Sequence, residues 1–215
     1  MTISQRWTIG NIFRLITARG WLEGVHFLSN AERPIDSLEE RRAARALRAD
    51  MEAFEEFVHR YERQILNYLW RMTNDEQAAY DLRQETFLRA WQHFTKIRDY
   101  ERPRAWLFHV ATNLALSHHR QHKRNVPSAT MSDELDSEIQ TPSDPIDSFV
   151  ESDLVHHVLQ AMQPRRRAAL ILRVIYGLSA EEIGQALGMT DNATRMTLSR
   201  GREQFRQIYA KEAQS

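Results

Sequence analysis

The segment SAEEIGQALGMTDNATRMTLSRGR, near the C-terminal end of the chain, carries two helix-start signals separated by a glycine. Ser179 can cap a first helix, and Glu182, three residues later, can reach back to complete a capping box. Gly188 then ends that helix, because a residue without Cβ adopts the left-handed backbone of a tight turn without steric cost. Thr190 or Asp191 can cap the helix that follows. The spacing therefore predicts a helix-turn-helix.

The second of these helices divides into a buried side and an outward side. Helical spacing places on the buried side Thr194, Leu198, Gly201, Phe205 and Ile208. It places on the outward side Asn192, Met196, Ser199 and Arg200, with Arg195 at the edge of that side. Such polar and basic side chains can enter a major groove to read base edges or hold phosphates. DNA is therefore the first candidate partner, and a helical bundle with a solvated charged face is the alternative.

Composition limits the classes to which the chain can belong. Its 215 residues, 42% of them hydrophobic, can bury one or two modest cores. It has no cysteine, which excludes disulfides and thiolate metal sites and is typical of a reducing cytoplasm. Charged residues interrupt the apolar positions near the N-terminus, so no run approaches the roughly 20 residues that a membrane helix needs. We expect a cytoplasmic protein without stable membrane insertion.

The apolar residues recur mostly at spacings of three and four, which predicts an all-α fold. Two small helical domains are expected, joined by a flexible acidic linker, the second domain being the helix-turn-helix domain. An N-terminal extension of unknown role covers residues 1–50, and the first domain covers residues 51–124. The linker covers residues 125–148, which are rich in Pro, Ser and Asp, and the second domain covers residues 149–210.

A helix expected from about residue 75 to 94 has two distinct sides. One broad side holds Ala78, Ala79, Leu82, Thr86, Ala90 and Phe94. The other side holds Asp81, Glu85, Leu88 and Gln92, so that an exposed leucine is framed by carboxylates. This side suits a protein partner better than DNA, because the acids repel phosphate and the leucine supplies a small apolar anchor. An ordinary solvated face is the alternative.

The next segment, RPRAWLFHVATNLALSHHRQHKR, mixes aromatic residues with cations and ends in a basic run. Single-stranded nucleic acid requires this combination, since unstacked bases stack on rings while Arg and Lys follow the backbone. Trp106, Val110 and Leu114 lie four residues apart, however, so burial of Trp106 in the core is the competing interpretation.

Three segments together resemble bacterial RNA polymerase sigma factors of the extracytoplasmic-function (ECF) group in their order and spacing. They are DLRQETFLRAW, RAWLFHVATNLALSHHRQHKR and LQAMQPRRRAALILRVIYGLSAEEIGQALGMTDNATRMTLSRGREQFR. The resemblance covers residues 51–124 and 150–208. It implies an alternative sigma factor that binds the polymerase core, recognises the minus-ten and minus-thirty-five promoter elements and helps to melt DNA. Its partners would be the polymerase core, promoter DNA and, as commonly in the family, an anti-sigma factor.

The resemblance also implies roles for individual residues. It assigns binding of the polymerase core to Asp81, Gln84, Glu85 and Leu88. Capture of the non-template strand of the minus-ten element falls on Trp106, His109, Asn113, Arg120, Lys123 and Arg124. Reading of the minus-thirty-five element falls on Asn192, Thr194, Arg195, Ser199 and Arg200. Met196 stands where relatives usually have a small polar residue, and Thr197 where they often have a basic one, so a relative's promoter sequence cannot be transferred to this chain.

Two other classes compete with this interpretation. A stand-alone helix-turn-helix regulator would act without core binding, and in its response-regulator form it needs a strand-helix receiver domain, for which no pattern precedes residue 150. For an enzyme, His118 and His122 stand one turn apart as a zinc pair would, but no third ligand, phosphate-binding loop or nucleophile motif accompanies them. We therefore expect no catalytic residues, no metal, no cofactor and no small-molecule substrate.

Overall fold

The computed structural model describes residues 38–125 and 153–214, and these residues form helices joined by short connections. The helices are α3 (Leu38–Thr73), α4 (Glu76–Gln92), α5 (Phe94–Ile97), α6 (Pro103–Asn125), α7 (Asp153–Ala161), α8 (Pro164–Val174), α9 (Ala180–Leu187) and α10 (Asp191–Glu212). The all-α prediction is confirmed for this part of the chain. Most of the N-terminal extension and of the proposed acidic linker lies outside the described residues. Within the described ranges, no helix has both the length and the hydropathy needed to cross a bilayer.

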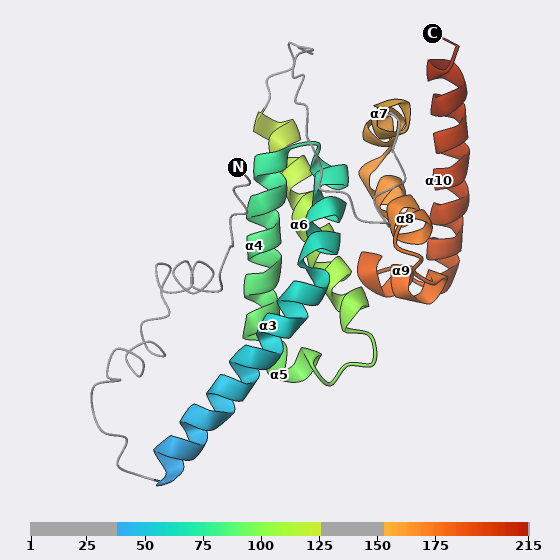
Figure 1. Ribbon diagram of the computed structural model, residues 1–215. Helices are drawn as coiled ribbons and strands as arrows, with labels where there is room; N and C mark the ends of the chain where they lie inside the picture. The colour runs from blue at the N-terminus through green and yellow to red at the C-terminus, as the bar shows by residue number, and fades with distance from the viewer. Residues whose placement is uncertain (1–37, 126–152, 215) are drawn as a thin grey trace.

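The N-terminal helix group consists of α3–α6, with α3, α4 and α6 packed lengthwise around an apolar core (Figure 1). Tyr68 and Phe108 are buried between them, with ring centroids 5.2 Å apart and an edge-to-face geometry that suits aromatic quadrupoles. The Tyr68 hydroxyl lies 2.6 Å from Thr112 Oγ1, so this buried phenol has a hydrogen-bond partner. Phe87 is also buried on α4, a position that the predicted apolar side of that helix did not include.

Helix α3 runs through the predicted boundary between the extension and the first domain at residue 50. Residues 38–50 are rich in Ala, Arg and Glu and contain neither Gly nor Pro, so nothing in their backbone preference ends the helix. The first turns of α3 project beyond the rest of the group (Figure 1). Arg98, which follows α5, pairs with Asp50 near the point where the helix leaves the body. The expected boundary at residue 50 therefore falls inside α3 and does not coincide with the start of a helix.

The C-terminal helix group consists of α7–α10 and contains the predicted helix-turn-helix. The capping box is confirmed: the Ser179 backbone N–H donates to Glu182 Oε2 at 2.8 Å, and the Glu182 N–H donates to Ser179 Oγ at 3.2 Å. Gly188 takes the left-handed conformation with φ of 61°, and Thr190 caps α10 through its side chain. A Cβ on Gly184 would lie 3.0 Å from the Met189 carbonyl oxygen, so α9 and α10 approach closely only because residue 184 has no side chain.

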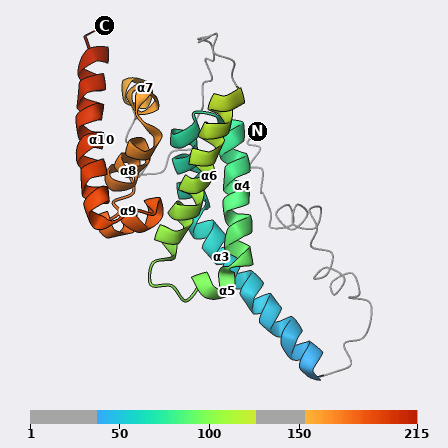
Figure 2. The ribbon, with the colours of Figure 1, turned by 180° about the vertical axis from the view of Figure 1, so that it is seen from behind.

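The two groups lie side by side and share one continuous hydrophobic cluster (Figures 1 and 2). Arg167 of α8 is only 3% exposed, and its guanidinium donates to the Met72 carbonyl oxygen at the end of α3 at 2.8 Å and to the Gln160 carbonyl oxygen at 2.8 Å. Burial lowers the pKa of Arg167 to about 10, so the group stays charged at neutral pH. A buried charge with these hydrogen bonds fixes how the two groups dock.

Candidate functional site

The first candidate surface lies on α4 and is set by the helical repeat. Asp81, Glu85, Leu88 and Gln92 follow one another at spacings of three and four, and Asp81 and Gln92 are exposed. Asp81 accepts a hydrogen bond from Gln77 at 3.3 Å, and Glu85 accepts one from Arg89 at 2.9 Å. The Glu85 carboxylate is thus held in place by a cation one turn further on, in the orientation that favours such pairs.

Leu88 and Gln84 are half-buried rather than fully exposed. The sequence predicted an exposed leucine on this face, whereas the structure leaves this side chain only partly accessible to solvent. The four residues expected to bind the polymerase core, Asp81, Gln84, Glu85 and Leu88, nevertheless lie within one sector of α4. Their surface combines acidic edges with a partly covered apolar centre.

The second candidate surface lies on the first half of α6, against the C-terminal group. Trp106 is half-buried and packs on the hydrophobic cluster, with its ring centroid 6.0 Å from that of His93. His109 Nε2 lies 3.0 Å from the side-chain amide nitrogen of Asn113, which acts as donor, so the ring proton belongs on Nδ1. Nδ1 then donates to the Ala186 carbonyl oxygen of α9 at 3.0 Å. His109 is therefore engaged in a contact between the groups.

An open cleft of about 530 Å³ adjoins this contact. Tyr100, Arg102 and Trp106 line one wall, and Glu181 and Gln185 of α9 line the other. Arg102 pairs with Glu181 at 3.1 Å, and the hydrogen bond that its guanidinium donates to that carboxylate raises the pKa of Arg102. Tyr100 is an exposed aromatic residue of the α5–α6 connection that the sequence interpretation did not single out, although it stands beside the aromatic and basic segment.

The remaining residues expected to contact the minus-ten element lie further along α6. Asn113 and Arg120 are exposed, and Arg120 donates to Ser117 Oγ at 2.9 Å. Lys123 and Arg124 belong to the last turn of α6, and the described structure does not extend to their side chains. The six expected residues therefore follow one helix: Trp106 lines the cleft beside α9, His109 contacts α9, and the other four lie further along α6.

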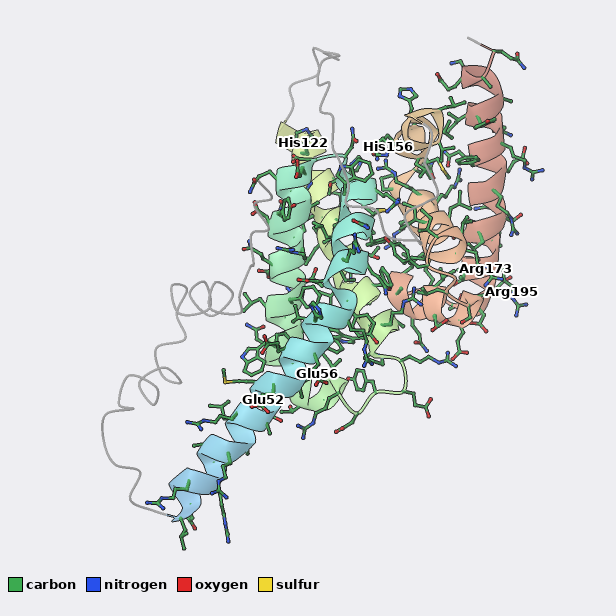
Figure 3. The ribbon with its side chains drawn as sticks, in the orientation of Figure 1. Glu52, Glu56, His122, His156, Arg173 and Arg195 are labelled. Atoms are coloured by element: carbon green, nitrogen blue, oxygen red, sulfur yellow. The ribbon has the colours of Figure 1, made fainter. Side chains whose placement is uncertain are left out.

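The third candidate surface is the outer side of α10. Its exposed residues include Asn192, Arg195, Met196, Ser199 and Arg200. Figure 3 shows Arg195 on the side of α10 that points away from the N-terminal group. The surface lies within the first three turns of a helix whose N-terminus is capped by Thr190, and a recognition helix presents such residues to a major groove.

Thr194 does not belong to this surface. It is completely buried, and its hydroxyl donates to the Thr190 carbonyl oxygen at 2.9 Å. The sequence placed Thr194 both on the inward side of the helix and among the expected DNA contacts, and the structure supports only the inward position. We therefore remove it from the contact set, because a side chain packed against Gly184 cannot reach a base.

His118 and His122 of α6, one turn apart, raised the question of a metal site. Their rings stack with centroids 6.3 Å apart. In residues 38–125 and 153–214 no third His, Asp or Glu joins them or any other pair in a metal-binding group. Two stacked imidazoles without a third ligand do not make a metal site in this part of the chain.

Comparison with known protein families matches two separate parts of the chain. The Sigma-70 region 2 family model matches residues 57–125, and the Sigma-70 region 4 model matches residues 152–205. The ECF RNA polymerase sigma factor SigE of Mycolicibacterium smegmatis is 30% identical over 170 residues, which cover 77% of this chain and 65% of that protein. SigL of Mycobacterium tuberculosis is 33% identical over 136 residues, which cover 62% of this chain and 76% of that protein.

Solved structures show the same fold at low identity. The sigma factor RpoE of Bartonella quintana, solved with the anti-sigma factor NepR, superposes with a TM-score of 0.59 at 19% identity, covering 73% of this chain and 96% of RpoE. CnrH, solved with the cytosolic domain of CnrY, superposes with a TM-score of 0.52 at 21% identity, covering 80% of this chain and 96% of CnrH. With both family models in order along one chain, the protein belongs to the extracytoplasmic-function group of RNA polymerase sigma factors, which direct promoter-specific transcription.

Proposed function

We propose that each of the three surfaces has its own task in transcription initiation. The α4 face, with Asp81, Glu85 and Leu88, binds the polymerase core. The α6 residues expected to contact the minus-ten element, from Trp106 to Arg124, capture its melted non-template strand, and the outer face of α10 reads the minus-thirty-five element. The polymerase core supplies the catalysis, so the chain acts as a binding module and contributes no chemical step of its own.

The observation that supports this proposal is the separation of an acidic face on α4 from a cationic face on α10 within one scaffold. The α4 face carries Asp81 and Glu85, which disfavour DNA phosphate, whereas the outer face of α10 presents Arg195 and Arg200 with hydrogen-bonding neighbours. A stand-alone DNA-binding regulator has no need for the α4 face. A sigma factor needs both.

The contact between the groups supports a further step in this function. His109 contacts α9, and Trp106 lines the open cleft that α9 borders, so a strand that stacks on Trp106 has to enter the space between α6 and α9. Strand capture therefore requires the C-terminal group to move away from α6. Binding of both promoter elements and of the core provides the free energy for this movement, so free promoter DNA alone is bound weakly and mostly through salt-sensitive phosphate contacts.

Run-off transcription tests the proposal directly. Purified core polymerase, the full chain and genomic promoter fragments should give specific transcripts. The Glu85→Lys variant should lose them, because it reverses a charge of the core-binding face and breaks the pair with Arg89.

The matched control for this experiment is Glu76→Lys. Glu76 is an exposed glutamate on the same helix, and nine residues at 100° each place it on the opposite side of α4. It should transcribe like the wild type and bind core equally well. Equal activity of the wild type and both variants would refute the assignment of the α4 face, and no core-dependent transcript from any of them would refute the function.

Two attributes complete the proposal. We place the protein in the cytoplasm, where core polymerase works. We also propose a regulator of the anti-sigma class as a partner, since the RpoE structure contains such a protein. We propose residues 51–124 and 149–210 as the two functional units, and we add to the first unit the turns of α3 that precede residue 51.

A further inference from the structure

One residue on the outer face of α10 does not fit a surface built to form hydrogen bonds. Met196 is 45% exposed, although its side chain is large and apolar. Asn192 lies one turn before it and Arg200 one turn after it, each about 6 Å away along the helix axis. These three residues form a row in which the two outer members can read base edges by hydrogen bonds and the central member cannot.

The burial pattern of α10 shows that this row faces the solvent. Thr194 and Leu198, which flank Met196 in sequence, are the residues that turn into the core. Ser199 and Arg195 lie beside the row and are exposed. Met196 therefore occupies the centre of the surface that would meet the major groove, in the second turn of the recognition helix.

We propose that Met196 determines promoter specificity by packing on the C5 methyl group of one thymine in the minus-thirty-five element. The thymine methyl is the apolar group that base pairs present in the major groove, whereas the other groups there are hydrogen-bond donors and acceptors. A methionine offers the groove no donor and only a weak acceptor, so its favourable contact is with that methyl. Its flexible, polarizable side chain also adapts to a position between two hydrogen-bonding neighbours.

This proposal rests on the proposed function, since it assumes that α10 reads the minus-thirty-five element. It adds a chemical prediction: at one position of the element, the methyl group itself is recognised.

The test replaces each thymine of the minus-thirty-five element, one at a time, by deoxyuridine, which lacks only the C5 methyl. The full chain is bound to core polymerase, and the affinity of this holoenzyme for each promoter fragment is measured by competition at fixed salt. One replacement should weaken binding by the wild type roughly fourfold, which is the effect of burying one methyl group at about 0.8 kcal/mol.

The variant that completes the cycle is Met196→Ala, which keeps a strong helix former at an exposed position. The Met196→Ala holoenzyme should bind the thymine fragment about as weakly as the wild type binds the deoxyuridine fragment. Replacing that thymine by deoxyuridine should then cause no further loss of affinity. Tyr209→Ala is the matched control, since Tyr209 is an exposed aromatic residue of the same helix, about 20 Å further along its axis. This control should keep the fourfold preference of the wild type.

Two results would overturn the proposal while leaving the proposed function intact. The first is promoter-specific binding by the wild type that no deoxyuridine replacement weakens. The second is a methyl preference of equal size in the wild type and in Met196→Ala. A wild-type holoenzyme that does not distinguish promoter from non-promoter DNA would instead refute the proposed function, and the methyl contact with it.

Discussion

Replacement of Tyr176 by alanine should open the contact between the two helix groups. Tyr176 lies in the connection between α8 and α9, and its hydroxyl donates to the Gln64 carbonyl oxygen of α3 at 3.0 Å. Its ring centroid is 4.9 Å from that of Phe108 and 6.0 Å from that of Tyr68. The side chain thus enters the N-terminal group from the C-terminal one, and its removal acts mainly on the docking of the groups.

The magnitude follows from the burial of this ring. Truncation of a buried aromatic side chain to alanine costs about 3–5 kcal/mol, because the transfer free energy is lost and a cavity remains. If that cost is borne by the closed arrangement, in which α9 lies against α6, the ratio of closed to open molecules falls by a factor of roughly 10² to 10⁴. Tyr176→Phe removes only the hydroxyl and should lower the ratio about tenfold or less.

Energy transfer between two dyes measures this ratio. The chain has no cysteine, so Arg60→Cys on α3 and Ala210→Cys on α10 give unique labelling sites at exposed positions. Single-molecule distributions should show one high-transfer population for the labelled parent and for Tyr209→Ala, and a broad low-transfer population for Tyr176→Ala. Circular dichroism confirms that the helices of each variant remain folded.

An unchanged high-transfer population in a folded Tyr176→Ala protein would refute the reasoning. Glu181→Arg provides a second perturbation in case the alanine variant unfolds. Its side chain is 60% exposed and pairs with Arg102, so the reversal leaves the cores intact and should shift the distribution a few-fold, with the shift decreasing at high salt.

Three further predictions concern the C-terminal group. Gly184→Ala places a Cβ 3.0 Å from the Met189 carbonyl oxygen and 3.1 Å from Thr194 Oγ1, and this overpacking should outweigh the roughly 1 kcal/mol by which a helix favours alanine over glycine, so a raised melting temperature would contradict the close packing of α9 against α10. The hydrogen bond from the Ser179 backbone N–H lowers the pKa of Glu182 in the folded protein, so between the folded and unfolded pKa values the unfolded state binds more protons. This contribution to stability is therefore present above the ordinary pKa near 4.5 and is lost as the pH falls through the lower pKa of the folded state. Glu182→Gln should flatten this acid dependence in urea unfolding curves, and a dependence as steep as that of the wild type would argue against it. Arg195→Ala should reduce the salt slope of holoenzyme binding to promoter DNA by about one and leave core binding unchanged, whereas loss of core binding would show that the surfaces are misassigned.

Local signals in the sequence predicted the helix-turn-helix because their effects act over a few residues. A capping box joins Ser179 to a residue three positions away, and a turn glycine such as Gly188 acts on its own backbone. The choice of Thr190 over Asp191 as the cap of α10 was left open by the sequence and decided by the structure. The continuation of α3 through residue 50 was missed because the prediction placed a boundary where composition changed, although no helix-ending residue stood there.

Residue exposure was predicted less well, because it depends on neighbours that helical spacing does not specify. Leu88 was expected to be exposed and is half-buried. For Trp106, the sequence left open whether the ring contacts bases or belongs to the core, and its half-buried position on the edge of a cleft keeps both interpretations compatible with the structure.

The sequence by itself determined the all-α class, the capped helix-turn-helix and the division of acidic and basic helix faces, since each depends on residues within a few turns of one another. Only the tertiary structure decided that α9 lies against α6 and covers part of the face that carries Trp106 and His109. That arrangement depends on contacts between residues distant in sequence, such as Arg167 with Met72 and Tyr176 with Gln64, which are 95 and 112 positions apart. The free energy of such contacts comes from burial and hydrogen bonding that exist only after both groups have folded. A local sequence pattern therefore does not predict these contacts.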